Sequence, residues 1–119
     1  MEVFLGRKNT ALNDIPKQVL NQIRDLSHLH QDEEVCGIIY NKYKDFMQCQ
    51  NISNNKSNSF CIDPYMFIEY DIDVVFHSHI TGSSYPSCWD MESSTKINIP
   101  YLIYSLRDKD FYLYNNIGV

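Results

Sequence analysis

The sequence has no long hydrophobic run, no excess of basic residues and no closely spaced pair of cysteines. Its longest uncharged apolar runs, such as Val35 to Tyr40, are far too short to cross a bilayer, so we expect no membrane segment. The first residues include Glu2, Arg7 and Lys8 and no long apolar stretch, so we expect no signal peptide. The formal net charge of −5 argues against nucleic-acid binding by a basic face.

The four cysteines, at positions 36, 49, 61 and 88, include no C-x-x-C pair. Without a secretory signal, the expected state is reduced thiols in a cytoplasmic compartment. Cys36 is expected to be a small buried residue rather than a ligand or nucleophile. Nothing in the spacing indicates a disulfide framework.

The length and composition are typical of one globular domain. The chain has 119 residues, of which 44% are hydrophobic and 21% are charged. These values exclude a disordered tail, a collagen-like repeat and a coiled coil. We therefore expect a single domain over residues 1–119.

The hydrophobic pattern predicts alternating helices and strands. Helical spacing of apolar residues favours a helix from Asp14 to about Leu29, with Asp14 as its N-cap and Pro16 in its first turn. A short helix that is capped at Asp63-Pro64, has Pro64 at its first helical position and runs through Tyr70 is also expected, as is another after Ser87. The polar stretch 51–59 is expected to be a surface loop. The expected strands are 35–40, 44–50, 72–77, 101–106 and 111–114. This order predicts an α/β or α+β fold with a mixed β-sheet flanked by helices.

The residues with the clearest chemistry lie between positions 77 and 90. His77 and His79 are two residues apart at the end of a predicted strand, so their side chains should project from the same face. Ser87 resembles a helix N-cap with Asp90 at the third helical position, which brings a carboxylate near the strand end. Two imidazoles and one carboxylate, with a fourth position left for water, are typical of a catalytic zinc site.

A hydrolytic zinc site also needs a base that does not bind the metal. The acidic trio of Asp32, Glu33 and Glu34 stands before a predicted buried strand, and the sequence pattern alone barely separates the three. Ser87 is suited to donate a hydrogen bond to an oxyanion. Trp89, inside the same segment, is expected to pack locally, with a substrate contact as the alternative.

These segments resemble the signature of a known family. E-x-C-G from Glu34 to Gly37, followed by H-S-H-x7-S-x-x-D from His77 to Asp90, resembles the JAMM metalloprotease signature of MPN+ domains. The first helix, the segment 60–64 and the strand around 100–105 are similar in order and spacing to the small prokaryotic and phage members. The resemblance implies an MPN/JAMM-type fold, which is related to the cytidine-deaminase-like fold.

The resemblance also implies a role for each residue. His77, His79 and Asp90 would bind Zn²⁺, Glu34 would be the general base that carries a proton to the leaving amine, and Ser87 would hold the oxyanion. The implied activity is zinc-dependent hydrolysis of a peptide or isopeptide bond in a protein or peptide substrate. A proline usually follows the second histidine in this family, whereas Ile80 stands here.

Within the family, the compact and Tyr- and Asn-rich chain most resembles the tail-assembly peptidases of tailed phages. Such proteins are often paired with an NlpC-type cysteine peptidase, so phage tail proteins and that peptidase are expected partners. The expected location is the cytoplasm of a bacterial host, or the virion tail. A processing peptidase for a ubiquitin-like or sulfur-carrier protein is the alternative.

Two other classes of function compete with a zinc peptidase. A zinc deaminase would need H-x-E and P-C-x-x-C, whereas this sequence has H-S-H and P-S-C-W-D. A structural tail-assembly subunit without catalysis is a third hypothesis, and replacing Glu34 by Gln would distinguish it from an enzyme.

Overall fold

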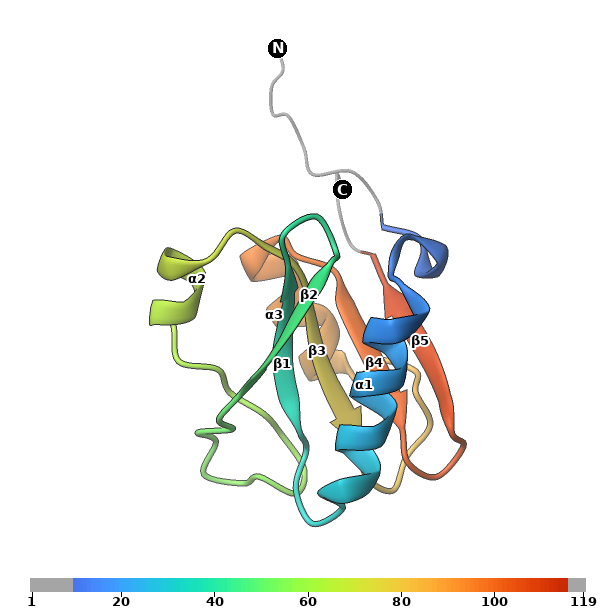
Figure 1. The fold of residues 1–119 in the computed structure, drawn as a ribbon. Helices are drawn as coiled ribbons and strands as arrows, with labels where there is room; N and C mark the ends of the chain where they lie inside the picture. Colours follow the sequence, from blue (N-terminus) through green and yellow to red (C-terminus); the bar gives the residue numbers. More distant parts are fainter. Residues whose placement is uncertain (1–9, 116–119) are drawn as a thin grey trace.

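Residues 10–115 are described by a computed structural model, in which helices cover both faces of a mixed β-sheet (Figure 1). The residues on which we based the expected lack of a signal peptide, Glu2, Arg7 and Lys8, lie outside this range. No helix in the described range is both long and apolar enough to cross a bilayer. In chain order the elements are a 3-10 turn (Leu12–Asp14), α1 (Lys17–Leu29), β1 (Cys36–Tyr40), β2 (Asp45–Cys49), α2 (Tyr65–Glu69), β3 (Ile72–His79), α3 (Cys88–Ile97), β4 (Tyr101–Ser105) and β5 (Asp110–Tyr114).

The sheet has the order β2-β1-β3-β4-β5 within the described residues. β1 is antiparallel to both β2 and β3, β3 is parallel to β4, and β4 is antiparallel to β5. The parallel pair needs a crossover connection, and α3 lies within it. The α+β class and the mixed sheet expected from the sequence are therefore confirmed.

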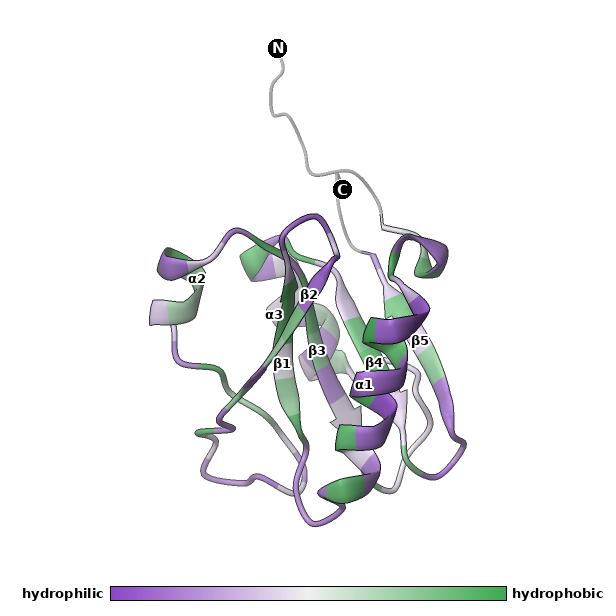
Figure 2. Cartoon of the chain, in the orientation of Figure 1, coloured by the Kyte–Doolittle hydropathy of each residue, from purple (hydrophilic) through white to green (hydrophobic). Residues whose placement is uncertain are grey.

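Side chains alternate along β3 between two apolar cores. Val74 and Phe76 pack with α1 on one face, whereas Val75 belongs to the core on the opposite face. Figure 1 shows α1 in front of the sheet and α3 behind it. Toward its C-terminal end β3 changes from hydrophobic to hydrophilic residues, and it is two residues longer than the predicted strand 72–77 (Figure 2). Both histidines at that end therefore belong to the strand.

The start of α1 differs from the prediction. Its buried positions Val19 and Ile23 follow the expected spacing, but Pro16 and not Asp14 is the N-cap. Pro16 has a ψ of 143°, and Ile15 before it is extended, as the steric clash with a following proline ring favours. The helix can begin only after this pair. The Asp14 carboxylate instead accepts a hydrogen bond from the Ala11 N–H at 2.9 Å, inside the 3-10 turn.

Gly37 marks a position where β1 and β2 approach too closely for a larger residue. A Cβ atom placed there would collide with the Met47 carbonyl oxygen and lie 2.8 Å from the Phe46 ring. At Gly82, by contrast, a Cβ atom would meet only open space. The glycine of the E-x-C-G segment is therefore required by the packing of the hairpin.

We predict that Gly37→Ala lowers the free energy of unfolding by about 1–3 kcal/mol, because the hairpin must shift to admit the methyl group. Gly82→Ala is the matched control and should change it by less than about 0.5 kcal/mol. Urea denaturation of the three proteins measures both effects. Equal stability of the two variants would contradict this role of Gly37.

Candidate metal centre

Three side chains from β3 and α3 converge at the C-terminal end of β3. Because His77 and His79 share the face that carries Val75, both point toward α3, whose third residue is Asp90. The Nε2 atom of His77 lies 3.1 Å from Oδ1 of Asp90, and the Nε2 atom of His79 lies 3.0 Å from Oδ2. The two Nε2 atoms are 3.2 Å apart. The two imidazole nitrogens thus face each other and the two oxygens of one carboxylate, and one ligand atom from each of the three residues lies within 4.8 Å of the others.

These separations are close to those of a tetrahedral zinc site. Bonds of about 2.0–2.1 Å at tetrahedral angles place ligand atoms about 3.3 Å apart. The two imidazole nitrogens are 3.2 Å apart, and one ligand atom from each of the three residues lies within 4.8 Å of the others, so a zinc-sized ion fits after an adjustment of the side chains. Two imidazole nitrogens and a carboxylate oxygen are also a donor set that catalytic zinc uses. In residues 10–115, this is the one group of three or more such side chains arranged to hold a metal ion.

The backbone after β3 fixes the orientation of His79. Its Nδ1 lies 2.7 Å from the carbonyl oxygen of Ser83. A carbonyl can only accept, so Nδ1 carries a proton. In the metal-free protein Nε2 faces the Asp90 carboxylate, and hydrogen bonds to Asp90 and Ser83 outweigh burial and raise the pKa of His79. Loss of the Nε2 proton would leave that atom a lone pair for a metal. A metal-ligating histidine commonly donates its other ring N–H in this way.

Aromatic packing, and not a hydrogen bond to its Nδ1 atom, orients the His77 ring on the side away from Asp90. The ring is fully buried and stacks on Phe60, with centroids 4.3 Å apart and planes inclined by 18°. Tyr101 packs against it edge-on at 5.5 Å. Its Nδ1 atom has no hydrogen-bond partner among the described residues. His77 is therefore oriented by shape, and burial lowers its pKa so that the neutral ring is favoured.

Asp90 is positioned by the start of α3. The predicted capping box is present: the Asp90 N–H donates to Ser87 Oγ at 3.0 Å, and the Ser87 N–H donates to Asp90 Oδ2 at 3.0 Å. Burial raises the pKa of the Asp90 carboxyl. Hydrogen bonds from His77, His79 and the Ser87 N–H outweigh that effect and hold the pKa well below its usual range. Asp90 is therefore ionised at neutral pH, which suits a metal ligand.

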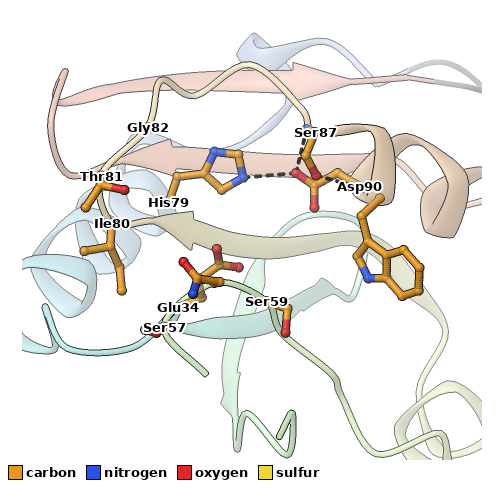
Figure 3. A pocket seen from close by; sticks show the side chains of 11 residues that line it. Glu34, Ser57, Ser59, His79, Ile80, Thr81, Gly82, Ser87 and Asp90 are labelled. Carbon is orange, nitrogen blue, oxygen red and sulfur yellow. Dashed lines mark hydrogen bonds and ion pairs between the residues drawn. The ribbon is translucent and has the colours of Figure 1, made fainter. Parts of the chain in front are cut away.

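Glu34 lies just before β1 and faces the same site. It lines a pocket of about 340 Å³ together with His79, Ser87 and Asp90. In Figure 3 its carboxylate points toward the side of the pocket where these residues lie. Burial raises the pKa of Glu34 to about 8, with the negative charge of Asp90 adding to the effect and His79 opposing it. A buried carboxyl with a pKa near neutrality is a candidate general base.

Two buried polar residues hold the backbone around Glu34. Asn51 donates from its amide to the carbonyl oxygens of Glu34 at 2.8 Å and Ser59 at 3.0 Å, and its Oδ1 accepts from the N–H groups of Ser53 and Cys61. Ser78, on the opposite face of β3 from the histidines, accepts from the Val35 N–H at 2.9 Å. The Glu34 N–H also donates to the carbonyl oxygen of Lys56 at 2.7 Å. The loop 51–59, expected only as a surface loop, thus fixes the position of Glu34.

The five residues selected from the sequence therefore lie together. His77, His79 and Asp90 contact one another, whereas Glu34 and Ser87 line the adjoining pocket. Of the acidic trio, Glu34 is the buried member. Asn51 and Phe60 were missed as supporting residues, because their contacts join segments far apart in the sequence. Ser78 could have been found from the sequence, because strand alternation puts this serine, which stands between the two histidines, on the opposite face of the strand, in the core.

Comparisons with known proteins support the fold and leave the activity open. No protein-family model matches the chain, and no curated protein matches it. A solution structure of a protein from Desulfitobacterium hafniense is similar, with a TM-score of 0.61 and 17% identity over 83% of this chain and 79% of that one. A solution structure from Salinibacter ruber gives a TM-score of 0.54 and 20% identity, covering 86% of this chain and 80% of that one. At these identities the likeness shows the fold alone.

We predict that Glu34→Gln stabilises the metal-free protein in a pH-dependent way. The unfolded chain loses the Glu34 proton above about pH 4.5, whereas the folded chain keeps it to about pH 8. The wild type therefore loses stability as pH rises from 4.5 to 8, and the variant lacks this loss. The difference in free energy of unfolding between the variant and the wild type should be near zero below about pH 4.5 and on the order of 2–4 kcal/mol at pH 8. Urea denaturation with a chelator present measures it, and a difference independent of pH would contradict the burial of this carboxyl.

Proposed function

We propose that the protein is a zinc-dependent peptidase or isopeptidase of the JAMM type. The observation that carries this proposal is the convergence of His77, His79 and Asp90 beside a pocket that Glu34 also lines. A structural zinc site is usually closed by four protein ligands, whereas three ligands beside an open pocket are typical of a catalytic site. The signature segments and the mixed α+β sheet support the further proposal of an MPN/JAMM-type fold.

The metal and the protein would divide the chemistry. Zinc held by His77, His79 and Asp90 would supply Lewis-acid chemistry, lowering the pKa of water toward about 7 and polarising a carbonyl group. Glu34, ionised beside a bound cation, would accept a proton from the attacking water. The same carboxyl group then returns the proton to the leaving amine.

Ser87 has a separate task. Its Oγ accepts the Asp90 N–H in the capping box, which leaves the hydroxyl proton available to an acceptor in the pocket. An oxyanion formed from the scissile carbonyl would be such an acceptor. The capping box also fixes the Ser87 backbone, so the donor is held in place before the substrate arrives.

The proposed setting is phage tail assembly, in the cytoplasm of a bacterial host or in the tail itself. This part rests on the likeness of the compact sequence to phage tail-assembly peptidases, and it makes tail proteins and an NlpC-type cysteine peptidase the proposed partners. Processing of a ubiquitin-like or sulfur-carrier protein uses the same chemistry on another substrate. A structural tail subunit would keep the zinc and lack the hydrolysis.

We predict that the purified protein binds close to one zinc ion per chain and that the double variant His77→Ala/His79→Ala binds none. His30→Ala is the control, because His30 is an exposed residue outside the site. Elemental analysis after reconstitution at neutral pH measures the stoichiometry. Wild-type protein without zinc under these conditions would remove the basis of the proposal.

We predict that Glu34→Gln keeps the zinc and loses hydrolysis by at least about 100-fold, since positioned general bases contribute factors of about 10²–10⁴. The readout is mass spectrometry of a proteome-derived peptide mixture and of ubiquitin-like fusion proteins incubated with zinc-loaded protein. Equal cleavage by wild type and variant would show a contaminating protease. Zinc binding without cleavage of either substrate set by the wild type would favour the structural subunit.

A further inference from the structure

A second pocket adjoins the catalytic one and has a different chemical character. It encloses about 330 Å³ between α3, β3, β4 and the segment after the loop 51–59. Its walls are mainly apolar and aromatic, formed by the side chains of Phe60, Ile62, Val75, Trp89, Ile97 and Tyr101 among others. We refer to it below as the apolar pocket. A cavity of about 150 Å³ with such walls binds benzene, so this one has room for a leucine or phenylalanine side chain.

The apolar pocket lies one aromatic ring away from the metal ligands. Phe60 and Tyr101 line it, and both pack directly on His77, with ring centroids 4.3 and 5.5 Å from the imidazole. Ser59 and Trp89 line both the apolar pocket and the catalytic pocket. A chain bound at the metal centre can therefore reach the apolar pocket within one or two residues, since an extended chain advances about 3.3–3.6 Å per residue.

Trp89 forms the boundary between the two pockets. It was expected to pack locally, but its side chain is 65% exposed. An exposed tryptophan between a polar and an apolar cavity presents a large rigid surface at low conformational cost, as such residues do in binding sites. Trp89 is also the one tryptophan in the sequence, so its indole N–H is a unique spectroscopic reporter.

We propose that the apolar pocket binds an apolar side chain of the substrate, one or two residues from the scissile bond, and so selects the cleavage site. This inference rests on the proposed peptidase function. The occupant is a peptide segment, because the two pockets share Ser59 and Trp89 in their linings and the first is lined by the groups proposed to act on a peptide carbonyl. Trp89 and Ile97 are specificity-determining residues in this arrangement.

The first experiment needs no catalysis. N-acetyl-leucine amide and N-acetyl-asparagine amide, which have side chains of similar shape, are titrated into ¹⁵N-labelled protein and followed by two-dimensional NMR. The leucine compound should shift the Trp89 indole signal and the Ile62 and Tyr101 amides, and bind about tenfold more tightly than the asparagine compound. Equal binding of the two compounds, or shifts confined to other parts of the protein, would overturn the proposal.

Two matched variants test the location. Ile97→Lys places a charge at the rim of the apolar pocket, on the last residue of α3, where a cation is favourable to the helix. It should weaken leucine amide binding at least fivefold. Ile68→Lys changes an 81% exposed isoleucine on α2 outside the pocket and should leave binding unchanged. Trp89→Ala removes the shared wall and should also weaken binding; retained binding in both Ile97→Lys and Trp89→Ala would overturn the assignment.

The second experiment separates this inference from the proposed function. Zinc-loaded wild type is incubated with a proteome-derived peptide mixture, and the residues flanking each new cut are counted. Enrichment of apolar residues at one flanking position, lost in Ile97→Lys and kept in Ile68→Lys, supports the inference. Cleavage without that enrichment overturns it while the peptidase proposal stands. Leucine selectivity by NMR without any cleavage overturns the peptidase proposal and leaves the pocket's chemical preference established.

Discussion

The site depends on one carboxylate, that of Asp90, which joins the end of β3 to the start of α3. Its Oδ1 contacts His77, and its Oδ2 contacts both His79 and the Ser87 N–H. The same side chain therefore closes a helix capping box and gathers two imidazoles. Because β3 and β4 are parallel, the chain must cross over between them, and the crossover helix begins next to the strand end that carries the histidines. The sheet topology therefore places Asp90 beside the two histidines.

The opposite side of the site is held by a different set of contacts. Glu34 lies between α1 and β1 and belongs to neither element. Its position therefore depends on the hydrogen bond from Asn51 to its carbonyl oxygen and on the hydrogen bond from the Val35 N–H to Ser78. Ser78 works from the α1 face of β3, while the histidines on either side of it face α3. One strand thereby fixes the two histidines on one face and, through Ser78 on the other, the segment that carries Glu34.

The parts that sequence could predict are those governed by local periodicity. Strand alternation put His77 and His79 on one face, and the Ser87–Asp90 spacing indicated the capping box, because both are set within a few residues. Asn51 and Phe60 could not be identified in this way. Asn51 contacts Glu34 and Phe60 contacts His77, and the two residues of each pair are 17 positions apart in the sequence. A local pattern does not encode contacts of that separation. The predicted start of α1 was wrong because the steric effect of Pro16, which keeps Ile15 extended, outweighed the tendency of Asp14 to cap a helix.

The electrostatics of the site explain why a divalent cation suits it. Two acidic groups, Glu34 and Asp90, are brought near each other in a largely buried space, and the ionised Asp90 raises the pKa of Glu34 further. Of the two imidazoles, that of His77 has its pKa lowered by burial, whereas hydrogen bonds to Asp90 and Ser83 outweigh burial and raise the pKa of His79, whose charge opposes the shift at Glu34. Without a cation, burial is the main reason that Glu34 stays protonated to about pH 8. A dication held by His77, His79 and Asp90 would change the electrostatic interaction with Glu34 from repulsion to attraction and would favour the carboxylate form that the proposed general base requires. The burial that destabilises the metal-free fold would then, with a cation bound, strengthen that attraction.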